Sequence, residues 1–233
     1  PLNTWWAEQG VILHTQFRDG NVPAGYEQLR VFIEALECVP VGVEQIRLRS
    51  DTAGYQHKLL KYCEMGKNER FGRIEFAIGG DVTDEFKKAV AEVEESDWHP
   101  IYKTVNGKKG KTGTEWAEVC FVPSKMGYSK KGPEYRYLAK RQAMAEQLGL
   151  PGMELQLTLP FQTMAMQGKR YKLFGIVTNM DWDGQELIHW HHERCGKSEE
   201  AHSVMKADLA GGKFPSGDFG ENAAWWWIMV IAH

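Results

Sequence analysis

The sequence has few cysteines and no long apolar run, and each shortage excludes a class of protein. Its four cysteines are scattered over 233 residues without a Cys-x2-Cys pair, which argues against a zinc ribbon and against a disulfide scaffold. No apolar run reaches the roughly 18 residues of a transmembrane helix, and the longest, from Ala223 to Ala232, suits a core helix. A charged amino-terminal region followed by an apolar core, the pattern of a secretory signal, is not seen in the sequence. We therefore expect a cytoplasmic protein with reduced thiols.

Net charge is also small, because 28 Lys and Arg nearly balance 31 Asp and Glu, leaving −3. The distribution is more informative than the sum. Residues 101–141 hold ten Lys or Arg and three Glu, a local charge of +7, so the rest of the chain carries −10. Such a block suits a phosphate-binding surface whose affinity falls with salt. A solvated loop with Lys-Gly turns explains the same composition equally well.

Hydrophobic periodicity predicts strands alternating with helices in a chain long enough for one substantial core. The predicted strands are 11–17, 43–51, 73–78, 98–102, 115–122, 135–140 and 171–178, and the predicted helices are 26–38, 55–65, 84–93 and 185–206. The first half has the order β-α-β-α-β, which favours a mixed or parallel sheet with helices packed against it.

One acidic residue stands where a predicted strand ends. Residues 43–51 alternate apolar and polar side chains and finish at Asp51, before Thr52-Ala53-Gly54 and a predicted helix. The carboxyl ends of strands are where α/β sheets place ligands and catalytic groups. Asp is also a favoured helix N-cap, so a purely structural role for Asp51 is the alternative.

A second acidic residue lies between two cations on the predicted helix 185–206. Arg194, Glu199 and Lys206 follow the order Arg-x4-Glu-x6-Lys. At 3.6 residues per turn Lys206 lies about two turns beyond Glu199 on the same face, whereas Arg194 is offset by about 140°. A carboxylate holds a divalent metal and neighbouring cations hold phosphates, so this pattern suits a site that cuts phosphodiesters.

Three segments carry a resemblance to a known family. The segments are 190–206, which contains the Arg-Glu-Lys pattern, 218–226, and 48–55 around Asp51, and the strand end at 177–179 is also similar to the family's segment before this helix. They resemble the catalytic regions of DDE transposases from bacterial insertion sequences, whose last acid lies in a Tyr-x2-Arg-x3-Glu-x6-Lys signature. The resemblance extends over nearly the whole chain.

The resemblance implies a fold and a reaction. The fold is an RNase H-like mixed sheet flanked by helices, with core segments 1–96 and 171–233 and a β-rich basic insertion at 97–170 before the last catalytic helix. The reaction is metal-dependent DNA cleavage and strand transfer at insertion-sequence ends, in the bacterial cytoplasm near the nucleoid. The implied partners are the double-stranded DNA of transposon ends and target, and the family also allows a homodimer in a synaptic complex.

The resemblance also assigns residues. Asp51 and Glu199 would be both the catalytic acids and the ligands of Mg2+ or Mn2+. The implied phosphate-binding residues are His191, Arg194, Lys206, Lys108, Lys109, Lys111, Lys130 and Lys131. His191 stands where the family has its Tyr, and one extra residue separates Arg194 from the acid. The x6 spacing to Lys206 favours Glu199 over the adjacent Glu200.

The family's first catalytic Asp precedes a strand resembling residues 10–17, and Pro1 to Gln9 contain no Asp. We therefore expect this Asp upstream of residue 1, in a longer protein. The main alternative is a catalytically inactive DNA-binding remnant, and an RNase H-like nuclease ranks below it. The sequence also allows a zinc site from His189, His191, His192 and Cys195, which is disfavoured because no second ligand cluster is evident.

Overall fold

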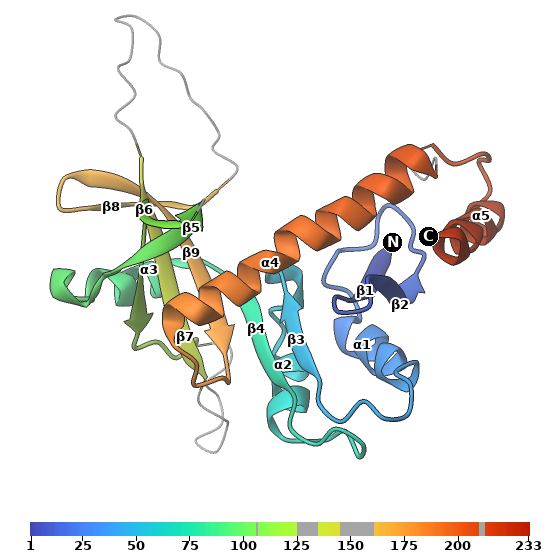
Figure 1. The fold of residues 1–233 in the computed structure, drawn as a ribbon, viewed down its shortest axis with the longest axis horizontal. Coiled ribbons are helices and arrows are strands. Elements are labelled where there is room, and N and C mark those ends of the chain that lie inside the picture. Colours follow the sequence, from blue (N-terminus) through green and yellow to red (C-terminus); the bar gives the residue numbers. More distant parts are fainter. Residues whose placement is uncertain (106, 125–134, 145–160, 210–212) are drawn as a thin grey trace, which may run out of the picture. The chain divides into compact units, whose positions relative to one another are not determined.

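The computed structural model describes residues 1–105, 107–124, 135–144, 161–209 and 213–233, with Val105 and residues 195–202 described by backbone alone (Figure 1). The chain divides into two compact units. The first unit comprises Pro1–Ile74 and Ile188–His233, and the second comprises Glu75–Leu187. Both contain helices and strands, so the expected α/β class is confirmed.

The first unit begins with a two-stranded antiparallel hairpin in which Asn3 pairs with Thr15. Its elements are β1 (Leu2–Trp6), β2 (Val11–Gln16), α1 (Gln28–Glu37), β3 (Arg47–Ser50), the 3-10 turn η1 (Thr52–Gly54), α2 (His57–Glu64), the second part of α4 (Gly184–Ser203), the π-helical turn η3 (Val204–Asp208) and α5 (Phe219–Ala232). The apolar residues of α1 at 31, 32, 35 and 36 are buried, as the amphipathic spacing predicts.

Helix α5 packs on this hairpin through a buried hydrogen-bonded chain. The indole Nε1 of Trp226 donates to Oγ1 of Thr15 at 2.9 Å, and that hydroxyl donates to Oδ1 of Asn3 at 2.6 Å. Trp226 also joins Met205 and Met229 in a small hydrophobic cluster. The middle residue of the Trp225-Trp226-Trp227 run is therefore a core residue, while its two neighbours remain exposed.

The second unit is built on an antiparallel sheet with the strand order β4-β9-β7-β6-β5. The short strand β8 pairs with the first part of β9, and β4 pairs with its last part. Its strands are β4 (Glu75–Gly80), β5 (His99–Val105), β6 (Lys108–Val119), β7 (Arg136–Ala143), β8 (Thr163–Met166) and β9 (Lys169–Thr178). Helix α3 (Asp84–Ala91) places Phe86 against Gly175, where an added Cβ would lie 3.3 Å from the ring. The 3-10 turn η2 (Glu95–Asp97) leads into β5.

Arg141 of β7 forms a charged network inside the second unit. Its side chain is 1% exposed and ion-pairs with Glu115 at 2.8 Å and with Glu95. The guanidinium lies between the rings of Trp98 and Tyr171, at 4.0 and 4.9 Å from their centroids. Arg141 belongs to the basic block at residues 101–141, but it is buried and its charge is paired with Glu95 and Glu115.

The structure confirms the predicted helices and most predicted strands, with three differences. The predicted strand 43–51 is shortened to β3, and β1 and β8 were not expected. The predicted segment boundaries at residues 96 and 170 differ from the boundaries of the two compact units. The reason is that β4 and β9 belong to the same sheet as β5, β6 and β7. The assignment of 97–170 as an insertion stays a prediction. In the part of the chain that is described, no helix has both the length and the apolarity to cross a bilayer.

Candidate functional site

Asp51 lies directly after β3, at the position that the sequence analysis singled out. Its side chain accepts a hydrogen bond from the backbone N–H of Ala53 at 3.0 Å and so caps the turn η1. Asp51 is therefore a cap, although of this short turn and not of the helix α2 that follows, whose N-cap position is Gln56. The residue as a whole is exposed, so the cap leaves a carboxylate at the surface of the first unit.

Helix α4 is fixed to the end of β3 by His191. The ring Nε2 of His191 lies 2.9 Å from the carbonyl oxygen of Ser50, the residue before Asp51. A carbonyl oxygen only accepts hydrogen bonds, so this nitrogen is the donor. His191 is buried, with 9% of its surface exposed. Residues 141 positions apart in the sequence are thus joined, and one nitrogen of the proposed phosphate ligand is occupied by the backbone.

Arg49 makes a second connection between β3 and α4. Its guanidinium donates to the carbonyl oxygen of Trp190, ion-pairs with Glu193 at 3.2 Å and lies 5.0 Å from the centre of the Trp190 ring. The Arg49 side chain is only 12% exposed. Sequence reasoning missed this residue, because Arg49 falls on the polar positions of the alternating strand before Asp51 and looks like a solvent-facing cation there.

The remaining signature residues lie further along α4. Glu199 is eight residues beyond His191, about 12 Å along the helix axis at 1.5 Å per residue, and its side chain is outside the described part. Arg194 lines the same cavity as Asp51. Lys206 is exposed in the π-helical turn. This wider turn departs from the 3.6-residue period on which the shared face of Glu199 and Lys206 was predicted.

The predicted phosphate-binding lysines are only partly described. Lys108, Lys109 and Lys111 are exposed on β6 of the second unit, and the ammonium of Lys109 lies 4.8 Å from the ring centre of Tyr102. Lys130 and Lys131 lie outside the described residues.

Among the described side chains, no three His, Cys, Asp or Glu residues come together as a group that could hold a metal ion. The residue that fits a metal best is Asp51, because one carboxylate bond to Ala53 fixes its orientation and hard cations such as Mg2+ take carboxylate oxygens. The zinc alternative stays a prediction, because the side chain of Cys195 is outside the described part.

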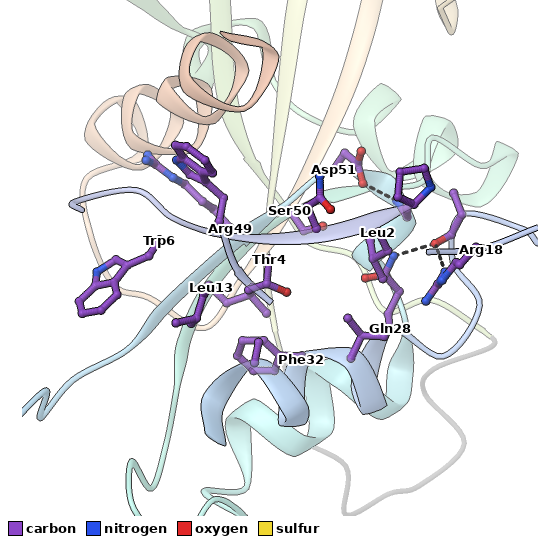
Figure 2. A pocket seen from close by; sticks show the side chains of 18 of the residues that line it. Leu2, Thr4, Trp6, Leu13, Arg18, Gln28, Phe32, Arg49, Ser50 and Asp51 are labelled. Atoms are coloured by element: carbon purple, nitrogen blue, oxygen red, sulfur yellow. Dashed lines mark hydrogen bonds between the residues drawn. The ribbon is translucent and has the colours of Figure 1, made fainter. Parts of the chain in front are cut away.

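A cavity of about 1270 Å3 lies beside these residues in the first unit (Figure 2). Its lining includes Asp51, Arg49, Trp190 and Arg194, together with residues of β1 and α1. Figure 2 shows Leu2, Thr4 and Trp6 of β1 among the residues that line this space, together with Arg49 and Ser50 of β3 and Asp51 directly after it. The end of β3 therefore borders both α4 and an open volume.

No protein-family model matches the chain, and no curated protein matches its sequence.

Proposed function

We propose that this chain is part of the catalytic core of a DDE-type DNA transposase, which cuts DNA and transfers a strand at insertion-sequence ends. One observation carries the proposal. His191 and Arg49 anchor α4, the helix with the Arg194-Glu199-Lys206 pattern, to the strand end that holds Asp51. Two acids that are 148 positions apart in the sequence thus belong to elements in direct contact.

Each residue has a role in this proposal. Asp51 and Glu199 would hold Mg2+ or Mn2+. A divalent ion held there would supply Lewis-acid activation of the attacking hydroxyl and charge stabilisation of the leaving oxygen. Arg194 and Lys206 would bind the DNA phosphates, which fixes the scissile bond without reading the sequence. Arg49 would hold α4 in place, because its guanidinium bonds to Trp190 and Glu193 on that helix.

Double-stranded DNA is the proposed substrate, and the lysines of β6 would extend its binding surface. Lys108, Lys109 and Lys111 are exposed within four residues of one another. Lysines placed along a groove or ribbon neutralise phosphates and release counterions. A homodimer that holds two transposon ends is compatible with this proposal.

A DNA-binding protein without catalysis is the second candidate. The observation that favours it is the engagement of Asp51 as a cap, which accounts for this residue without any metal. The two candidates share the basic surface and differ only in chemistry, so a cleavage assay separates them.

The test is Mg2+- or Mn2+-dependent nicking of supercoiled DNA by the full-length protein. Glu199→Gln removes the charge of the proposed ligand, and Glu200→Gln is the matched control on the same helix. We expect Glu199→Gln to lower nicking about a hundredfold or more and Glu200→Gln to retain it. DNA binding without nicking by the unsubstituted protein would instead support the second candidate. The opposite result for the two substitutions would move the role to Glu200.

A further inference from the structure

One face of the sheet in the second unit carries an exposed aromatic ring. Along β9, Tyr171 and Gly175 are buried, and Phe86 of α3 packs against Gly175. Lys172 is half-buried, and Phe174 has 37% of its surface exposed. Successive residues of a strand point to opposite faces. Helix α3 therefore covers one face of β9, and Lys172 and Phe174 lie on the other.

The register of the sheet brings residues of β7 and β8 to the same face (Figure 1). Lys140 of β7 pairs with Phe174, and Gln142 pairs with Lys172. On the other side of β9, Thr163 of β8 also pairs with Lys172. Residues directly opposite each other in a sheet share a face. We call this surface the outer sheet face, and its residues are Lys140, Gln142, Thr163, Arg170, Lys172 and Phe174.

Two lysines of the outer sheet face each lie over an aromatic ring. The Nζ of Lys140 is 4.5 Å from the ring centre of Phe174, and the Nζ of Lys172 is 4.0 Å from that of Phe161. An ammonium at such a distance is attracted by the electrons of the ring. Each pair therefore holds a positive charge beside an aromatic surface. A nucleotide needs the same combination, because its base stacks on rings and its phosphate binds cations.

The charge of these strands has one sign. Strands β7, β8 and β9 together contain six Lys or Arg and no Asp or Glu. Two of the six, Arg136 and Arg141, form ion pairs with glutamates of other segments. The other cations include Lys140, Arg170 and Lys172 of the outer sheet face. Charge complementarity therefore favours a polyanion as the occupant of this face, and the rings favour one that carries bases.

We propose that the outer sheet face binds single-stranded nucleic acid, with a base stacked on Phe174 and phosphates held by Lys140, Arg170 and Lys172. Unpaired strands have bases that can leave their own stack and lie on protein rings. A duplex keeps its bases paired and stacked inside, so it could offer only phosphates to this surface. The inference does not rest on the proposed transposase function, because binding of this kind needs neither a metal nor the acids Asp51 and Glu199.

The test measures the affinity of the chain for labelled oligonucleotides of about ten residues by fluorescence anisotropy. EDTA in the buffer keeps metal-dependent cleavage out of the measurement. Oligo-dU and oligo-rU differ only in the 2′-hydroxyl, so their two affinities tell whether DNA or RNA is preferred. A duplex of the same length shows how much of the binding needs unpaired bases. We expect single strands to bind more tightly than the duplex.

Substitutions of Phe174 separate stacking from packing. Phe174→Leu keeps an apolar side chain but removes the ring, and it should weaken single-strand binding about fivefold or more. Phe174→Tyr keeps a ring and should retain the binding. Tyr26→Ala is the control, since it removes a ring that is 55% exposed on the first unit and should change nothing. Lys172→Gln should lower the slope of log affinity against log salt by about 0.7 for a single strand.

Circular dichroism shows whether each variant keeps the fold. Unchanged single-strand affinity of a folded Phe174→Leu would overturn the proposal, and so would an equal loss of duplex affinity in that variant. Failure of the parent chain to bind either oligonucleotide would overturn it as well. If Phe174→Leu does not fold, Lys172→Gln decides, because an unchanged salt slope would remove the phosphate contact on which the proposal depends. None of these outcomes depends on nicking, so the transposase proposal stands or fails separately.

Discussion

Asp51 combines a structural role with a proposed chemical one, and two substitutions separate them. Asn caps helical turns as well as Asp, whereas Ala does not. Asp51→Asn should therefore keep stability within about 0.5 kcal/mol and still abolish metal-dependent nicking. Asp51→Ala should lose nicking and about 1 kcal/mol of stability. Urea unfolding and the nicking assay measure the two effects. Full nicking by Asp51→Asn would reduce Asp51 to a cap.

Glu95 gives a prediction about pH. Its hydrogen bond with Arg141 lowers the pKa of the Glu95 carboxyl below the ordinary value of 4.5. A depressed pKa in the folded state means that the unfolded state binds more protons, so stability is present above about pH 4.5 and is lost as the pH falls. The thermal midpoint should therefore decline more steeply between about pH 5 and pH 3 in the parent protein than in Glu95→Gln. Parallel declines would show that the ion pair contributes nothing to folding.

At the residue scale the sequence correctly placed Asp51 at the end of a strand, because an alternating pattern followed by a turn can be read from the sequence alone. It could not show that His191 donates to Ser50, since that contact joins residues 141 positions apart. Arg49 was missed for a related reason. The role of Arg49 depends on its contacts with the ring of Trp190 and the carboxylate of Glu193. These groups lie beside Arg49 only in the folded chain.

At the scale of elements, periodicity predicted α1, α3, β9 and α4 well, because their buried faces repeat regularly. The strand β6 begins at Lys108, seven residues before the predicted start at Glu115. Its first half is rich in Lys and Gly and resembles a turn, yet it pairs with β5 from Val105 to Tyr102. Pairing with a neighbouring strand overrides weak local propensity. The four-residue β8 is too short to show a period.

The attachment of α4 to β3 can be tested at the same scale. His191→Leu removes the donor to the Ser50 carbonyl and should cost about 1–3 kcal/mol of unfolding free energy. The matched control is His189→Leu, two residues earlier on the same helix, where the side chain is exposed and the expected change is within about 0.5 kcal/mol. Chemical denaturation of both variants measures the difference. Equal stability of the two would mean that the hydrogen bond does not hold the helix.

At the scale of the whole molecule, charge is distributed along the chain far less evenly than the net value of −3 indicates. The block at 101–141 contains ten cations, but Arg136 pairs with Glu118 and Arg141 is buried. Neither is available to a ligand. The cations of this block that are exposed in the described part are Lys103, Lys108, Lys109 and Lys111. The exposed lysines of this block in the described part therefore all lie on the hairpin formed by β5 and β6.

This division predicts how DNA binding depends on salt. Each lysine that contacts a phosphate adds about 0.9 to the slope of log affinity against log salt. Replacing Lys108, Lys109 and Lys111 by alanine should therefore lower that slope by up to about 3 and weaken binding at low salt. The control replaces three exposed lysines away from the hairpin, Lys58, Lys67 and Lys88, and removes the same charge. Fluorescence anisotropy with a labelled duplex, from low to physiological salt, gives both slopes.

If the two triple variants lose slope equally, binding follows total charge, and the hairpin is not the DNA-binding surface. If only the hairpin variant loses slope, the position of the lysines decides binding, as a defined phosphate-binding surface requires.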